Sequence, residues 1–184
     1  YTLWHTLSLH DALPIYFVRQ MNKKGNYVEI LGLVGDNNTW NRSNGFHSVV
    51  DEFPELKMVA QQSADFDRNK AMDVMETIMQ ANPDIDAVFC GNDAMAMGAY
   101  QAVLAASKAG EVKVFGFDGA RDAVNGVADG KIEATVMQFP VLMSRTSADL
   151  AHQYLNGERD FRSKTPVEVI LITPENVEEY LPEN

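Results

Sequence analysis

The sequence of 184 residues contains little of what several classes of protein depend on. It has a single cysteine, Cys90, so no disulfide can form within the chain. Only 15 lysines and arginines stand against 26 acidic residues, and the net charge of -11 argues against nucleic acid or an anionic membrane surface as a partner. No apolar run approaches the roughly 20 residues of a membrane-spanning helix, so we expect no membrane insertion.

Motifs for nucleotide binding, metal binding and catalysis are also missing. The sequence holds no G-x-G-x-x-G, no P-loop and no ligand spacing typical of a metal site. His47 and His152 fall within helical patterns, and Cys90 has no matching base in a catalytic context. We therefore expect no cofactor, no metal and no catalytic residues. A small α/β enzyme with an unrecognised site is the alternative.

The sequence does contain a regular alternation of predicted strands and helices. Runs of β-branched and aromatic residues indicate strands, and apolar residues at helical spacing indicate helices between them. The expected strands are 27–34, 56–61, 87–90, 112–119, 134–137 and 167–172; the expected helices are 16–24, 41–53, 67–80, 93–108, 120–128, 141–155 and 175–180. This order predicts an α/β fold, a doubly wound parallel sheet with helices on both faces.

Residues 1–15 do not fit this pattern. They show neither a helical nor a strand period, and the run from Ser8 to Ile15 resembles a translated sequencing adapter. We set residues 1–15 aside as a foreign segment, with a genuine N-terminal arm as the alternative. On this hypothesis the natural protein begins well before Tyr16, and the chain is a C-terminal piece of it.

Polar side chains recur where the predicted strands end. Asn92, Asp118 and Gln138 follow three of the strands. Because the carboxyl ends of parallel strands form one crevice, we expect these side chains to converge. Asn and Asp are also ordinary turn and cap residues, and capping is the preferred interpretation for Asp67 and Asp93.

Such a set of groups suits a sugar or a polyol. Each hydroxyl of a sugar both donates and accepts a hydrogen bond, which matches carboxylate and amide groups. The C–H face of a sugar ring packs on aromatic rings, and Phe66 and Trp40 are the candidates. Core packing is the alternative for both. Arg42 could reach the crevice from the first turn of its helix, with a solvated helix position as its alternative.

Four segments in order resemble the ribose-type periplasmic sugar-binding proteins of ABC transporters. They are 64–68 (ADFDR), 92–99 (NDAMAMGA), 114–119 (VFGFDG) and 137–140 (MQFP). The likeness extends over roughly 16–172. The resemblance implies that the aligned aromatic, asparagine, aspartate and glutamine contact the sugar; these are Phe66, Asn92, Asp118 and Gln138.

The resemblance also implies a particular departure from ribose. The family has an R-x-R-G-x-G-F segment at the start of this lobe's first helix, and here it is 40–46 (WNRSNGF). Trp40 replaces the first arginine, a sugar contact in the ribose-specific members, while Arg42 matches the second. The exchange points to a different pentose, a hexose or a sugar alcohol, held with more stacking and one fewer charged donor.

The family fold consists of two α/β lobes that close on the ligand about three hinge crossovers. The resemblance implies that 16–137 is the ligand-binding lobe, and that 138–165 is a hinge crossover with a helix of the mostly absent other lobe. Residues 166–184 are then a return strand and an acidic tail. Apolar side chains of the helix 141–155 should be partly exposed in this chain, because their partner surface is missing.

The implied function is that of a periplasmic solute-binding component of an ABC sugar importer. It would bind a monosaccharide or sugar alcohol and deliver it to a membrane permease, and a chemoreceptor is a possible second partner. A signal peptide would have been lost with the missing N-terminal part. The alternative is the effector-binding domain of a LacI-type transcription repressor, which shares the fold and needs an N-terminal helix-turn-helix.

Overall fold

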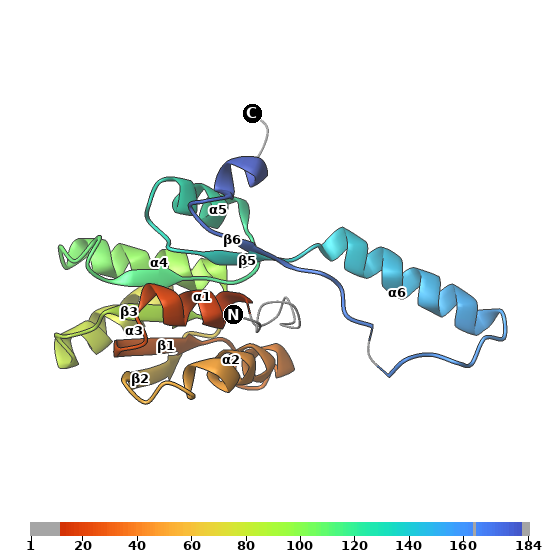
Figure 1. Ribbon diagram of the computed structural model, residues 1–184, viewed down its shortest axis with the longest axis horizontal. Helices are drawn as coiled ribbons and strands as arrows, with labels where there is room; N and C mark the ends of the chain where they lie inside the picture. Colours follow the sequence, from red (N-terminus) through yellow and green to blue (C-terminus); the bar gives the residue numbers. More distant parts are fainter. Residues whose placement is uncertain (1–11, 164, 182–184) are drawn as a thin grey trace, which may run out of the picture.

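A four-stranded parallel sheet forms the centre of the computed structural model, which describes residues 12–163 and 165–181 (Figure 1). The strand order is β2-β1-β3-β4. The bounds are Gly25–Leu31 for β1, Leu56–Ser63 for β2, Ala87–Cys90 for β3 and Lys113–Phe115 for β4. All four residues of β3 are buried, as expected of a parallel strand covered on both faces, whereas β2 is a largely exposed edge strand.

Helices cover both faces of this sheet. On one face lie α1 (Ala12–Gln20) and α2 (Asn37–Val50); α3 (Arg68–Ala81), α4 (Asp93–Ala105) and α5 (Arg121–Ala128) cover the opposite face. The alternation of side chains along β1 divides the core accordingly, because Val28 and Ile30 pack with α3 and α4 while Tyr27 packs with α1 and α2. The predicted doubly wound α/β fold is confirmed.

The sheet is not parallel throughout, which corrects one expectation. The strand β5 (Thr135–Met137) continues the parallel order through bridges from Phe115 to Ala134 and from Asp118 to Met137. The last strand, β6 (Ile170–Ile172), pairs with β5 in the antiparallel sense. The chain returns to the sheet beside the strand it left, so the two strands run in opposite directions.

The boundary expected at residue 15 falls inside helix α1. This helix begins at Ala12, and Leu13 is only 3% exposed in the aromatic core around Phe17 and Phe46. Residues 12–15 therefore belong to helix α1, while the foreign origin of residues 1–15 stays a prediction. Residues 1–11 lie outside the part of the chain that the structure describes.

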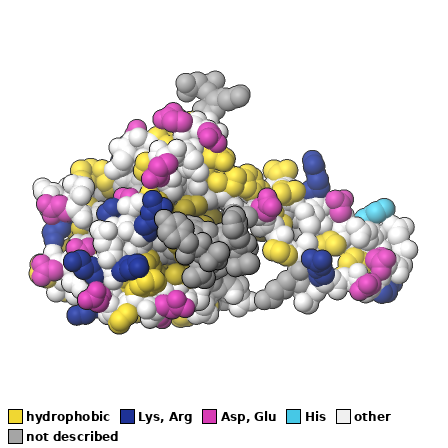
Figure 2. Space-filling model, viewed as in Figure 1, with side chains coloured by type: hydrophobic (Ala, Val, Ile, Leu, Met, Phe, Trp, Pro, Cys, Tyr) yellow, Lys and Arg dark blue, Asp and Glu magenta, His cyan; other side chains and the backbone are white. Residues whose placement is uncertain are grey.

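Helix α6 (Pro140–Leu155) projects from the body as an arm, and none of its residues is buried (Figure 1). Leu142, Met143 and Tyr154 are 46%, 43% and 53% exposed, so the expected exposure of its apolar side chains is confirmed. Apolar surface is visible along the arm in Figure 2. The expected tail helix is a short 3-10 turn, Val177–Tyr180, which lies against α5.

Candidate ligand-binding site

Three predicted site residues meet at the carboxyl ends of the strands. The Oδ1 atom of Asp118 accepts a hydrogen bond from Arg42 Nη2 at 2.8 Å and another from Gln138 Nε2 at 2.7 Å. Asp118 lies in the loop after β4, Gln138 follows β5, and Arg42 comes from α2. The predicted convergence of strand ends is therefore confirmed for Asp118 and Gln138.

Arg42 is held firmly in this arrangement. Its Nη1 donates to the carbonyl of Gly91 at 2.6 Å, and its guanidinium carbon lies 4.4 Å from the ring centroid of Phe117 and 5.8 Å from that of Phe66. The side chain is only 16% exposed, so the alternative of a solvated helix position is wrong. Because Arg42 is already ordered, a ligand that contacts it loses less conformational entropy on binding.

The backbone of Asp118 is strained and tied to β5. Its φ of 128° is unusual for a residue with a Cβ, and such outliers concentrate at functional sites. Its N–H donates to the carbonyl of Val136 at 2.9 Å, and its carbonyl accepts from the N–H of Gln138 at 3.1 Å. Among the described residues, no group donates to Asp118 Oδ2, which leaves this oxygen free to accept from a ligand.

Burial raises the pKa of the Asp118 carboxyl above its ordinary value. The charge of Arg42 and the hydrogen bonds from Gln138 and Arg42 act in the opposite direction. The pair is therefore a partly desolvated carboxylate beside a fixed cation. Its charges cancel, while an acceptor atom stays open.

Asn92, not Asp93, caps helix α4, which corrects the capping interpretation of Asp93. The extended backbone of Asn92 has the geometry of an N-cap, and its Oδ1 accepts from Met95 N at 2.9 Å. Nδ2 of Asn92 has no acceptor among the described residues, so this donor is open to a ligand. The capping interpretation of Asp67 is confirmed, because its Oδ1 accepts from Lys70 N at 2.8 Å.

Phe66 lies beside Arg42 and packs against the backbone of Gly32, directly after strand β1. It adopts a left-handed conformation (φ 62°), and a Cβ at Gly32 would lie 2.1 Å from its ring. The residue is half-buried; it packs against the hydrophobic core and also lies near the Arg42 guanidinium. Core packing and a ligand contact are compatible for this residue.

Trp40 lies apart from these residues. Its Nε1 donates to the carbonyl of Val34 at 2.9 Å, and the residue is 40% exposed, so core packing is wrong for Trp40. The adjoining Leu33 and Val34 are also exposed. The indole is thus anchored over the loop after β1, outside the cleft that Arg42 lines.

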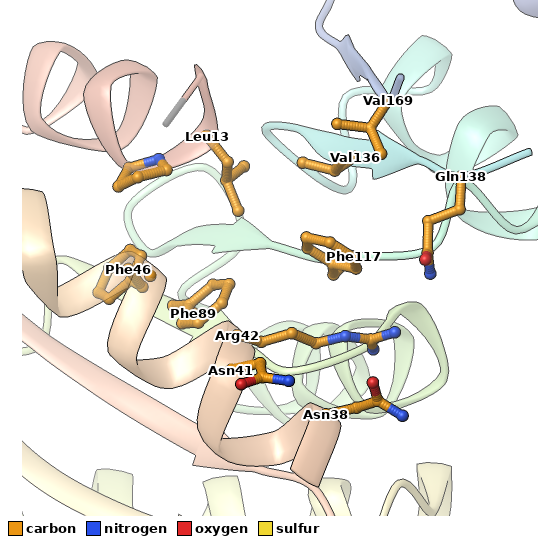
Figure 3. Close-up of a pocket in the computed structure, with 12 residues that line it drawn as sticks. Leu13, Asn38, Asn41, Arg42, Phe46, Phe89, Phe117, Val136, Gln138 and Val169 are labelled. Atoms are coloured by element: carbon orange, nitrogen blue, oxygen red, sulfur yellow. The ribbon is translucent and has the colours of Figure 1, made fainter. Parts of the chain in front are cut away.

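A cleft of about 190 Å³ opens beside Arg42 and Gln138 (Figure 3). Its polar end carries side chains of α2 and the exit of β5, and its apolar end reaches the aromatic core. The lining residues include Asn38, Asn41, Arg42, Phe46, Phe89, Phe117, Val136, Gln138 and Val169. Sequence reasoning missed Asn41 and Phe117. Asn38, Asn41, Arg42 and Phe46 recur at helical spacing, which could have indicated Asn41. No such spacing indicates Phe117.

The described residues offer no arrangement for catalysis by metal or thiol. No group of three or more His, Cys, Asp or Glu among them could hold a metal ion. Cys90 is fully buried, and burial raises the pKa of its thiol. Within this part of the chain, no helix is both long and apolar enough to cross a membrane. What the site offers is hydrogen bonding and aromatic surface.

An α/β lobe with carboxylate, amide and guanidinium groups at its strand ends has the features of a site for a small polar ligand. A family model described as "Periplasmic binding protein domain" matches residues 16–159. The chain belongs to this family, and the resemblance inferred from its sequence is confirmed.

Named relatives carry the comparison further. The chain is 42% identical over 161 residues to the D-apiose import binding protein of Paraburkholderia graminis, covering 87% of this chain and 51% of that protein. It is 39% identical over 149 residues to a ribose import binding protein of Bacillus subtilis, covering 81% and 48%. The chain thus spans about half the length of these curated relatives.

A solved structure gives the same result for the fold. The crystal structure of an ABC transporter periplasmic solute binding protein from Actinobacillus succinogenes, with bound D-allose, matches with a TM-score of 0.86 and 32% identity. The match covers 93% of this chain and 60% of that one.

Proposed function

We propose that the chain is the ligand-binding lobe of a solute-binding protein of an ABC sugar importer. The protein captures a monosaccharide or sugar alcohol in the periplasm and delivers it to a membrane permease. The observation that carries this proposal is the shared Asp118 oxygen. Arg42 and Gln138, which line the cleft, occupy Oδ1 and leave Oδ2 of Asp118 as an acceptor.

The chemistry of the site favours a neutral polyhydroxylated ligand. Asp118 Oδ2 accepts, Asn92 Nδ2 donates, and the amide of Gln138 retains its oxygen as an acceptor. The positive charge of Arg42 is already balanced by Asp118, so a sugar acid or sugar phosphate gains no unpaired cation here. The rings of Phe66 and Phe117 flank the same groups and suit the C–H face of a sugar.

The anchoring of Trp40 supports a ligand other than ribose. Trp40 stands where ribose-specific members have an arginine, and its indole is turned toward the carbonyl of Val34. No charged donor is available from this position. We infer a different pentose, a hexose or a sugar alcohol.

The exposed helix α6 supports a second lobe in the complete protein. Leu142, Met143 and Tyr154 present apolar surface with no cover among the described residues. In this proposal residues 138–165 form a hinge crossover and a helix that belongs to the other lobe, and the two lobes close about three such crossovers. Ligand then stabilises the closed form by contacting both lobes. The permease, and a chemoreceptor where one is present, recognises that form.

The names of the relatives support this hypothesis over the two alternatives. Those reported above are import binding proteins, and neither a LacI-type repressor nor an enzyme is among them. The upstream gene sequence separates the alternatives directly. A signal peptide agrees with a periplasmic binding protein, and a basic DNA-binding headpiece contradicts it.

A thermal-shift screen of the full-length protein tests the proposed function. The panel contains D-apiose, D-ribose, D-allose, myo-inositol, other pentoses and hexoses, and a sugar phosphate and a sugar acid as charged controls. At least one neutral sugar should raise the melting temperature, because a ligand at 100 times its Kd stabilises the native state by about 2.7 kcal/mol. A shift with the charged controls alone would contradict the proposal.

A further inference from the structure

Asp93 is a buried carboxylate beside the candidate site whose role lies outside capping and ligand contact. It is 1% exposed and directly follows Asn92. Its Oδ2 accepts from Ala120 N at 2.7 Å, and its Oδ1 accepts from the Thr135 hydroxyl at 2.6 Å. The same hydroxyl oxygen accepts from Gly119 N at 3.3 Å.

These hydrogen bonds join the three segments that carry the ligand-facing polar groups. Asp93 N donates to the carbonyl of Phe117 at 2.8 Å, one residue before Asp118. Its carboxylate holds the N–H of Ala120, two residues after Asp118. Through Thr135 it reaches β5, which leads to Gln138. One side chain therefore ties the start of α4, the loop after β4 and the strand β5 together.

The backbone is shaped around this carboxylate. A Cβ at Gly116 would lie 2.3 Å from Asp93 Oδ1, so only glycine leaves room for it there. Burial raises the pKa of Asp93 to about 6, against the hydrogen bonds from Thr135 and Ala120. The fold thus retains a carboxylate that is costly to desolvate, which favours a role in fixing geometry over a role in net stability.

We propose that Asp93 is a positioning residue of the ligand site. It fixes Asn92, Asp118 and Gln138 relative to one another, and so sets ligand affinity without touching the ligand. The strained backbone of Asp118 needs this support, because the bonds of Asp93 lie on both sides of it. The inference rests on the proposed function and assigns a determinant of affinity to it.

Isothermal titration of the full-length protein with D-apiose, D-ribose and D-allose tests this role. In Asp93→Asn the side-chain oxygen can accept from only one of its two donors, and we expect Kd to rise about tenfold. Thr135→Val should raise Kd several-fold, and Thr135→Ser, which keeps the hydroxyl, should restore it. Glu29→Gln is the matched control, because Glu29 is a carboxylate buried in the same sheet that bonds to His47 and Gln61. Its Kd should stay within twofold of wild type.

A second titration separates positioning from a general loss of stability. In an Asp118→Ala background, Asp93→Asn should raise Kd by clearly less than tenfold, because one of the three groups that Asp93 positions is already gone. Its effect on the free energy of unfolding in urea should persist. An equal fold-change in both backgrounds would overturn the inference, as would unchanged affinity in Asp93→Asn. If Asp93→Asn does not fold, the two Thr135 variants decide, and equal affinities in them refute the role. A wild-type protein that binds no sugar of the panel contradicts the proposed function and the inference with it.

Discussion

Replacement of Asp118 by alanine tests the site most directly. The substitution removes the acceptor that Arg42 and Gln138 share, and with it the open Oδ2. Two donors then lose their partner in the free protein, and a ligand hydroxyl loses its acceptor in the complex. The change leaves the core intact, because the Asp118 side chain is 35% exposed at the edge of the sheet.

The expected loss of affinity exceeds the expected loss of stability. A hydrogen bond to a charged group contributes about 1.5–3 kcal/mol, which corresponds to an increase in Kd of roughly 10- to 150-fold. Release of Arg42 and Gln138 from their fixed positions acts in the same direction, so we expect the upper half of this range. A partly exposed ion pair contributes only about 1 kcal/mol or less to folding.

The measurement compares the full-length wild type and variant by isothermal titration with the sugar of highest affinity in the screen, and by urea denaturation. Asp122→Ala is the matched control, since Asp122 also pairs with an arginine, Arg68, but at an exposed position away from the cleft. Its affinity should equal that of wild type. Retention of affinity within threefold in a folded Asp118→Ala protein would refute the site assignment.

Three further predictions concern pH, packing and the second lobe. Glu29, and then Asp51, raises the pKa of His47 to about 9, so the stability that protonated His47 contributes is complete below about pH 6.5 and is lost as the pH rises through 9. Urea denaturation should show the free energy of unfolding falling between pH 6.5 and 9, and His47→Gln should make this fall smaller. The same pH dependence in wild type and variant would contradict the role of the ion pair. Gly32→Ala, whose Cβ would collide with the Phe66 ring, should cost about 1–3 kcal/mol, whereas Gly45→Ala, with open space in α2, should be neutral or stabilising in the same assay. The 184-residue chain alone should bind sugar far more weakly than the full-length protein, and comparable affinities would rule out a second contributing lobe.

The sequence predicted the features that depend on short-range pattern. Apolar periodicity located the helices and strands, and the strand-end rule brought Asp118 and Gln138 together. The sequence did not predict features that depend on which of two neighbouring residues takes a given role. Asn92 and Asp93 both suit a helix start, and only the backbone geometry assigns the cap to Asn92 and frees Asp93 for other bonds.

The sequence also did not predict how a helix is oriented or how distant segments pair. Helix α2 begins at Asn37 and not at Asn41, so Trp40 lies within the helix, about 200° around its axis from Arg42. The motif placed both residues near the ligand, but only one face of a helix can line a cleft. The antiparallel pairing of β6 likewise depends on how the chain returns after α6, which no local pattern encodes.

The arm formed by α6 leaves the sheet at Gln138 and returns through Val169, and both residues line the cleft. A partner that packs against α6 and a ligand that binds in the cleft therefore both contact or displace the same two chain segments, at Gln138 and Val169. A partner that docks on helix α6 and shifts the position of these two chain segments changes the affinity for the ligand by a coupling free energy. By thermodynamic reciprocity the ligand changes the strength of that docking by the same amount.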